Sequence, residues 1–164
     1  MHTRALKAKH APPLFVRPLR NGDVETVAAV FDRLGDRSRR SRFHGPKPRL
    51  TESDLKHLAT IDANRHALVA YVAGDARPVA IARLVRDGDS AEIAFEVADE
   101  HQRHGVGSAL TGELLADARA AGVREVTALV ASDNTAAVSL LHRVLDRLEI
   151  RFEGPELSIR AALA

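Results

Sequence analysis

The chain has 164 residues, of which 45% are hydrophobic and 28% are charged, and its formal net charge is +2. This length and composition predict one domain with its own hydrophobic core. The absence of cysteine excludes disulfides, thiolate metal sites and cysteine nucleophiles. The small net charge, the single tyrosine and the absence of tryptophan argue against a nucleic-acid partner.

The N-terminal residues predict an arm. Residues 1–13 are charged, contain no continuous apolar segment and end in Ala11-Pro12-Pro13, so we expect a flexible arm followed by the functional domain over residues 14–164. The same residues lack the apolar segment of a secretory signal. No apolar run approaches the roughly 18 residues that a membrane span needs, so we expect no membrane partner and a cytoplasmic location.

Strand and helix patterns follow in chain order. A short apolar run over 14–19 predicts a strand, apolar residues at helical spacing over 24–31 predict a helix, and residues 36–60 predict helix, loop and helix. Glycine-bearing turns separate the next three apolar runs and predict an antiparallel meander. Further strands are expected after each of the two helices that follow. The strands of this second part are predicted over residues 67–73, 79–85, 92–98, 125–130, 150–152 and 157–160.

This order predicts an α/β domain with one mixed, mostly antiparallel central sheet and helices on both faces. The turn between residues 92–98 and the next helix is suited to bind an anion. Its glycines let the backbone approach a ligand closely, and the first helical turn offers unpaired N–H groups to phosphate oxygens. Tight packing at Gly105 and Gly107 without a ligand is the alternative. Because the turn follows a meander and not a parallel βαβ unit, a dinucleotide is disfavoured as its ligand.

The pattern resembles the GCN5-related N-acetyltransferase (GNAT) superfamily over residues 14 to 162. The cofactor motif of that family is Gln or Arg, two residues, Gly, one residue, and Gly or Ala, and it is present here from Gln102 to Gly107. Asn134 starts the following helix, where the family often has an asparagine. The resemblance implies a GNAT-like fold, acetyl-CoA as co-substrate and transfer of an acetyl group to an amine.

A closer likeness is to the acetyltransferase domain of bacterial protein lysine acetyltransferases. It is carried by residues 38–43, Leu50-Thr51, Asp62 with 65–70, and 91–94. It implies a protein lysine as acceptor, for example on an acyl-CoA synthetase-like protein. A small-molecule amine acetyltransferase and a non-catalytic acyl-CoA-binding module remain alternatives.

The resemblance also implies the cofactor contacts. The strand over 92–98 would splay from the strand over 125–130 and pair with the pantetheine arm, and the N–H of Val97 or a neighbour would donate to the oxyanion. One such donor is worth about 10²–10³ in rate. Asn134 either contacts the pantetheine arm or caps its helix. The pyrophosphate would be wrapped by amides of the turn, with side-chain contacts from Arg103 and His104 or with these two solvated; the turn residues are Arg103, His104, Gly105, Val106, Gly107 and Ser108.

Glu92 is the predicted general base. A lysine amine has a pKa of about 10.4 and is mostly charged at neutral pH, and a carboxylate near the cleft can take its proton, directly or through water. Residues 92, 94 and 96 share one face of the strand, and we expect partial burial of Glu92. An ion pair with an arginine is the alternative. Glu96 is the reserve candidate for the base, with a solvent-facing or paired acid as its alternative.

Two further features bear on the mechanism. Many family members carry a tyrosine general acid seven residues after the asparagine, but this position is Leu141 here, which leaves only the adjacent His142 as a weak alternative. A coenzyme A thiolate needs little protonation near pH 8. The arginines of residues 37–49 predict a cationic surface on the acceptor side, which attracts an acidic protein or stays solvated and paired. His101 and His104 are expected to be surface side chains, with no metal site.

Overall fold

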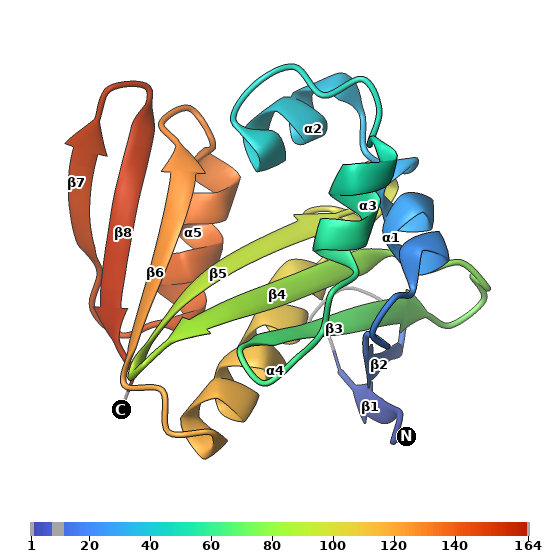
Figure 1. Cartoon of the computed structure of the whole chain (residues 1–164), viewed down its shortest axis with the longest axis horizontal. Helices are drawn as coiled ribbons and strands as arrows, with labels where there is room; N and C mark the ends of the chain where they lie inside the picture. The colour runs from blue at the N-terminus through green and yellow to red at the C-terminus, as the bar shows by residue number, and fades with distance from the viewer. Residues whose placement is uncertain (1, 8–11, 164) are drawn as a thin grey trace.

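The computed structural model describes residues 2–7 and 12–163, and these form one eight-stranded sheet in the order β1-β2-β3-β4-β5-β6-β8-β7 (Figure 1). Every neighbouring pair is antiparallel except β5 and β6, which are parallel. The strands are β1 (Arg4–Leu6), β2 (Leu14–Pro18), β3 (Arg65–Val72), β4 (Ala80–Asp87), β5 (Ser90–Val97), β6 (Glu125–Ala131), β7 (Glu149–Glu153) and β8 (Glu156–Ala162). The helices are α1 (Val24–Phe31), α2 (Asp36–Phe43), α3 (Glu52–Leu58), the 3-10 helix η1 (Asp99–His101), α4 (Val106–Ala120) and α5 (Thr135–Val144).

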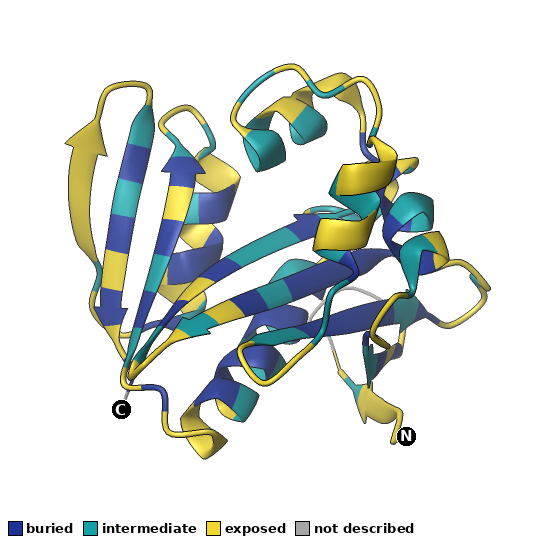
Figure 2. Cartoon of the chain, in the orientation of Figure 1, coloured by how far each residue is buried: buried dark blue, intermediate teal, exposed yellow. Residues whose placement is uncertain are grey.

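Each face of the sheet has its own apolar core. On one face, α4 and α5 pack against most of the strands through residues such as Leu110, Leu114 and Leu141. On the other, α1 and α3 cover β3 and β4 through a smaller cluster that includes Val27 and Val30. Figure 2 shows the buried positions concentrated along the central strands. The predicted mixed, mostly antiparallel sheet with helices on both faces is therefore confirmed. No helix within the described residues is long and apolar enough to cross a membrane.

The prediction of a flexible arm over residues 1–13 is wrong for Arg4–Leu6. These residues form β1, which pairs antiparallel with β2. Arg4 also contacts α4, with its guanidinium 3.1 Å from Glu113 Oε2 and 3.3 Å from Asp117 Oδ1. Backbone pairing with an open sheet edge and these ion pairs hold a segment that has too few apolar residues to show a strand pattern. Residues 1 and 8–11, also within the predicted arm, lie outside the described residues.

The sheet opens between β5 and β6. β5 pairs with β4 along its whole length, and β6 pairs with β8 in the same way. β5 and β6 pair with each other only at the register Ser90 with Glu125 to Glu92 with Thr127. Beyond residue 92 the two strands diverge, as Figure 1 shows, and their facing backbone edges are left without a strand partner. The predicted splay of these strands is thus confirmed.

Candidate active site

A cavity of about 800 Å³ opens where β5 and β6 diverge. Its volume lies in the range of sites that bind cofactors and drug-sized ligands. One wall is β5 from Glu92 to Val97, and the opposite wall is β6 over residues 128–130 together with one face of α5. The turn after β5 closes one end, and α2 lies across the cavity with Arg37, Ser38, Ser41 and Arg42 among its lining residues. The turn, two strands and two helices therefore enclose one site.

Most of the predicted site residues meet at this cavity. His104 and Val106 do not line it: His104 is exposed, and the side chain of Val106 is 1% exposed in the core. The backbone N–H of Val106 still belongs to the first turn of α4. The predicted residues that line the cavity are Glu92, Val97, Gln102, Arg103, Gly105, Gly107, Ser108 and Asn134.

The turn before α4 presents backbone donors to the cavity. Gly105 is the N-cap of α4 and has a left-handed backbone with φ +83°, a conformation that glycine adopts without strain. Arg103 is also left-handed, with φ +64°. No side chain among the described residues caps this helix. Its first N–H groups are therefore available to an anion, and the helix dipole favours negative charge there.

Gly107 is required by packing as well as by the cavity. A Cβ atom at this position would lie 2.7 Å from Leu140 Cδ1 of α5 and 3.3 Å from Val97 Cγ2 of β5. Both distances are shorter than ordinary contacts between carbon atoms. A side chain at this position would have to displace the ends of Leu140 and Val97, so the ligand-binding and packing interpretations of Gly107 are compatible.

The N–H of Val97 points into the opening between the strands. Just beyond the paired residues, the Ala98 N–H donates to the Val79 carbonyl at 2.7 Å. Hydrogen-bonded and non-bonded pairs alternate along antiparallel strands. The next pair, Ala80 with Val97, is therefore non-bonded, and the backbone groups of Val97 face away from β4. The N–H of Val97 thus lies on the free edge of β5, where the sequence predicted an oxyanion donor.

The side chain of Gln102 is turned toward protein atoms. Its Nε2 lies 2.9 Å from the Val97 carbonyl, 3.1 Å from Ser38 Oγ and 3.3 Å from Asp99 Oδ1. The first residue of the cofactor motif therefore links the end of β5, the turn and α2. This role was not predicted from the sequence, because the motif does not indicate that Ser38 lies beside the turn.

The two glutamates of β5 lie in different environments, and Glu96 has the paired environment that was one of its predicted alternatives. Glu92 is exposed, so the expectation of partial burial is wrong, and it has no ion-pair partner among the described residues. The side chain of Glu96 is 3% exposed and lies between two arginines: Oε2 is 2.8 Å from Arg42 Nε and Oε1 is 3.4 Å from Arg83 Nη2. Burial lowers the pKa of Arg83, and Glu96 opposes this shift. Glu96 is thus a paired acid, and Glu92 is the free carboxylate.

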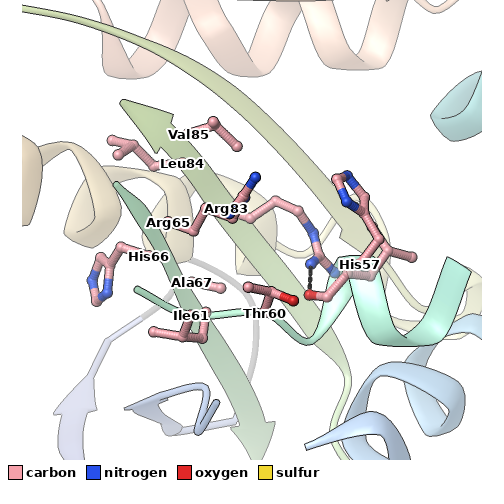
Figure 3. Close-up of a pocket in the computed structure, with 10 residues that line it drawn as sticks. His57, Thr60, Ile61, Arg65, His66, Ala67, Arg83, Leu84 and Val85 are labelled. Carbon is pink, nitrogen blue, oxygen red and sulfur yellow. Dashed lines mark hydrogen bonds between the residues drawn. The ribbon is translucent and has the colours of Figure 1, made fainter. Parts of the chain in front are cut away.

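Arg83 also borders a second, smaller cavity of about 40 Å³. It lies between α3, β3 and β4, and Figure 3 shows Arg83 among the residues that line it. At its edge, Arg83 Nη1 donates to the Leu58 carbonyl. This hydrogen bond is 2.5 Å long. The space fits a few water molecules at most and is too small for a cofactor. Arg83 therefore holds α3 with one end of its guanidinium and Glu96 with the other.

Asn134 is a helix cap. Its side-chain oxygen accepts a hydrogen bond from the Ala137 N–H at 3.1 Å. Asn134 also lines the cavity. The capping interpretation is confirmed, and a pantetheine contact stays a prediction. Leu141 is fully buried, whereas His142 is exposed and lies outside the cavity lining. His142 is therefore poorly placed to protonate a leaving group.

The arginine-rich segment over residues 37–49 is partly internal. Arg39 stacks on Phe31 at 4.1 Å and donates to the Pro48 carbonyl at 2.9 Å. Lys47 pairs with Asp54 at 2.9 Å, and Arg42 pairs with Glu96 as described. The exposed members of the segment are Arg37, Arg40 and Arg49. The predicted pairing is thus found for Arg39, Arg42 and Lys47, which are half of the six arginine and lysine residues of this segment.

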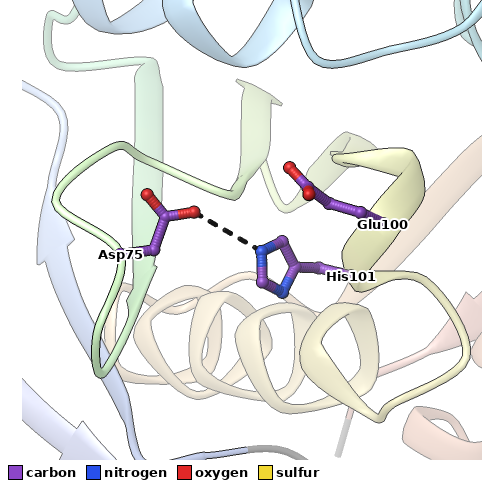
Figure 4. A group of neighbouring side chains, drawn as sticks. All are labelled: Asp75, Glu100 and His101. Carbon is purple, nitrogen blue, oxygen red and sulfur yellow. Dashed lines mark ion pairs between the residues drawn. The ribbon is translucent and has the colours of Figure 1, made fainter.

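A cluster of Asp75, Glu100 and His101 has the composition of a metal site (Figure 4). Arg33, whose side chain is 7% exposed, lies among these groups. Its Nη2 is 2.6 Å from Asp75 Oδ2 and 3.3 Å from His101 Nε2, and it also pairs with Glu100. The guanidinium therefore supplies the positive charge that the cluster needs. The cluster joins the loop after α1 to η1 and so fixes the start of the turn.

Replacing Arg33 by Met should destabilise the fold by about 2 kcal/mol, because it removes the buried guanidinium that pairs with both Asp75 and Glu100. The Arg77 backbone N–H and the Arg33 guanidinium lower the pKa of Asp75. The stability from Asp75 is therefore present above its unfolded pKa of about 3.9 and lost as the pH falls below it. Urea unfolding at pH 7 and in acid measures both effects. Arg77→Met, whose side chain is 65% exposed, is the control and should change stability by less than about 0.5 kcal/mol. Equal effects of the two substitutions would contradict the assignment.

Comparison with known proteins now decides the family. Residues 31–146 match the Acetyltransferase (GNAT) family. The chain belongs to the GNAT family. It is 33% identical over 138 residues to the acetyltransferase Pat of Mycolicibacterium smegmatis, in an alignment that covers 82% of this chain and 40% of that protein. The matched region is thus less than half of that relative's length.

Two solved structures have folds similar to that of this GNAT chain. The GNAT domain of S. lividans PAT has a TM-score of 0.89 at 28% identity, with 98% of this chain and 97% of that chain covered. The PaiA N-acetyltransferase of Thermoplasma acidophilum, in complex with coenzyme A, has a TM-score of 0.68 at 15% identity, with 91% and 98% covered. The second likeness shows the fold alone. Together with the family match, these findings confirm the predicted GNAT resemblance and the acyltransferase class.

Proposed function

We propose that the chain transfers the acetyl group of acetyl-CoA to a protein lysine. The observation that carries this proposal is the cavity between β5 and β6. It combines the uncapped start of α4, the free backbone edge of β5 and the unpaired carboxylate of Glu92. The likeness to the Pat acetyltransferase and to a GNAT structure in complex with coenzyme A supports the choice of acetyl-CoA as the donor.

In this proposal the turn residues 103–108 bind the pyrophosphate of acetyl-CoA. Their backbone N–H groups donate to phosphate oxygens, and the Arg103 side chain adds positive charge. The pantetheine arm runs along β5 and takes the place of the missing β6 partner. The N–H of Val97 then donates to the thioester oxygen, where negative charge develops during attack.

Glu92 acts as the general base. It takes a proton from the lysine ammonium, directly or through a water molecule, and the neutral amine nitrogen attacks the thioester carbon. The carbon–nitrogen bond forms, the nitrogen loses its second proton to solvent, the carbon–sulfur bond breaks and coenzyme A leaves as a thiolate. Leu141 offers no proton at the position where many relatives have tyrosine. The thiolate therefore takes its proton from solvent, which its ordinary thiol pKa of about 8.5 permits.

The acceptor is tested by incubating cell lysate with isotope-labelled acetyl-CoA and the purified protein, followed by mass spectrometry of proteins and small molecules. We expect label on protein lysines that is absent with Glu92→Gln. An acyl-CoA synthetase-like protein among the labelled species would support the finer prediction. Label only on small amines would favour the alternative acceptor, and binding without any label would favour an acyl-CoA-binding module.

A further inference from the structure

The helix α2 is attached to the rest of the fold by polar contacts and by one aromatic contact, in which Phe43 packs edge-on against Phe31 with 5.7 Å between the ring centroids. None of its eight residues is buried, and Figure 2 shows no buried position along it. Its sequence, DRSRRSRF, contains a single apolar residue, Phe43. Most helices in proteins are held by packing of an apolar face. The position of α2 over the cavity therefore depends on its contacts with the Phe31 ring and on a few specific polar links.

Three of these links lead to the strand and turn of the cofactor site. The Gly35 N–H, at the N-cap of α2, donates to Asp99 Oδ2 at 3.0 Å. Ser38 Oγ accepts from Gln102 Nε2 at 3.1 Å, and one turn later Arg42 Nε lies 2.8 Å from Glu96 Oε2. Residues 38 and 42 share one face of the helix because they are four positions apart. This face of α2 is thus fixed to β5 and to the turn that follows it.

Gln102 connects α2 to β5 through a single side-chain nitrogen. Its Nε2 donates to the Val97 carbonyl as well as to Ser38. One side chain therefore joins the residue that offers the oxyanion donor to the helix that lines the acceptor side. A glutamate could not replace it, because a carboxylate would have no hydrogen to donate to the carbonyl.

We propose that Gln102 is a positioning residue that couples the cofactor strand to the acceptor side of the cavity through its hydrogen bond to Ser38. Its contribution to acetyl transfer is made by holding α2, and with it the acceptor, against the free edge of β5. This inference rests on the proposed acetyltransferase function. Gln102, the first residue of the cofactor motif, therefore positions the acceptor as well as the cofactor.

The test compares Ser38→Ala with Ser41→Ala. Both serines lie on α2 and line the cavity, but only Ser38 accepts from Gln102. With an N-terminally blocked lysine peptide as acceptor, Ser38→Ala should raise the acceptor KM roughly 3–10-fold, the equivalent of one lost hydrogen bond. The acetyl-CoA Kd should stay within about twofold. Ser41→Ala removes a hydroxyl of the same lining without breaking the link to Gln102, so it should raise the acceptor KM less than Ser38→Ala does.

A double-mutant cycle makes the coupling measurable. Gln102→Leu should raise the acceptor KM, and Gln102→Glu should act in the same direction as a variant of similar shape. If the hydrogen bond carries the coupling, Ser38→Ala should have little further effect in the Gln102→Leu background. Fully additive effects, or equal effects of Ser38→Ala and Ser41→Ala, would overturn the proposal and leave the acetyltransferase function intact. A wild-type protein that binds acetyl-CoA but acetylates no acceptor would overturn the function, and this inference with it.

Discussion

Glu92→Gln is expected to lower kcat by roughly 10²–10³ and to leave the acetyl-CoA Kd within about twofold. The amide keeps the shape of the side chain but cannot take a proton from the acceptor ammonium. Because Glu92 is exposed and has no ion-pair partner among the described residues, the substitution should not lower the melting temperature. Steady-state kinetics and calorimetric titration with acetyl-CoA measure the two quantities separately.

Glu96→Gln is the informative comparison, because both glutamates lie on the same face of β5. Glu96 is buried between Arg42 and Arg83, and removing its charge should destabilise the fold by about 3 kcal/mol. Its main effect should therefore appear in unfolding experiments, whereas that of Glu92→Gln should appear in turnover. A kcat for Glu92→Gln within threefold of the wild type would remove Glu92 from the mechanism.

Gly107→Glu is expected to weaken acetyl-CoA binding at least about 100-fold, because it places a negative charge at the predicted phosphate site and a side chain where none fits. The Cβ alone would lie 2.7 Å from Leu140 Cδ1. Gly107→Ala adds this clash without the charge and should cost about 1–3 kcal/mol of stability. Calorimetry with acetyl-CoA on both variants separates the charge from the packing.

Gly112→Ala is the matched control in the same helix. A Cβ at Gly112 would meet no atom within 4 Å, and alanine favours a helix over glycine by about 1 kcal/mol. This variant should therefore be slightly more stable and should bind acetyl-CoA like the wild type. Binding by Gly107→Glu at wild-type affinity would refute the assignment of the phosphate site to this turn.

Apart from the arm, part of which forms β1, the predictions that rested on local pattern agree with the structure. The turn from Gln102 to Gly107 lies between a strand and a helix, as its glycines indicated, and Gly105 has the left-handed backbone that such a turn needs. The order of strands and turns was sufficient to predict the mixed sheet, because short turns impose antiparallel pairing and the helical connection imposes the single parallel pair.

The features that depend on distant residues could not be predicted. Alternation along a strand places Glu92 and Glu96 on one face, but only the tertiary fold puts Arg42 and Arg83 around Glu96 and leaves Glu92 free. The strand β1 depends on the open edge of β2 and has too few residues for a pattern of its own. The link from Gln102 to Ser38 joins positions 64 residues apart, and no local pattern reports such a contact.

The central claim is that the opening between β5 and β6 holds acetyl-CoA. Calorimetric titration of the wild-type protein with acetyl-CoA tests it most directly. We predict saturable binding at one site per chain with a Kd of tens of micromolar or lower, equivalent to about 6 kcal/mol or more of binding free energy. No detectable heat or saturation at these concentrations would contradict the account.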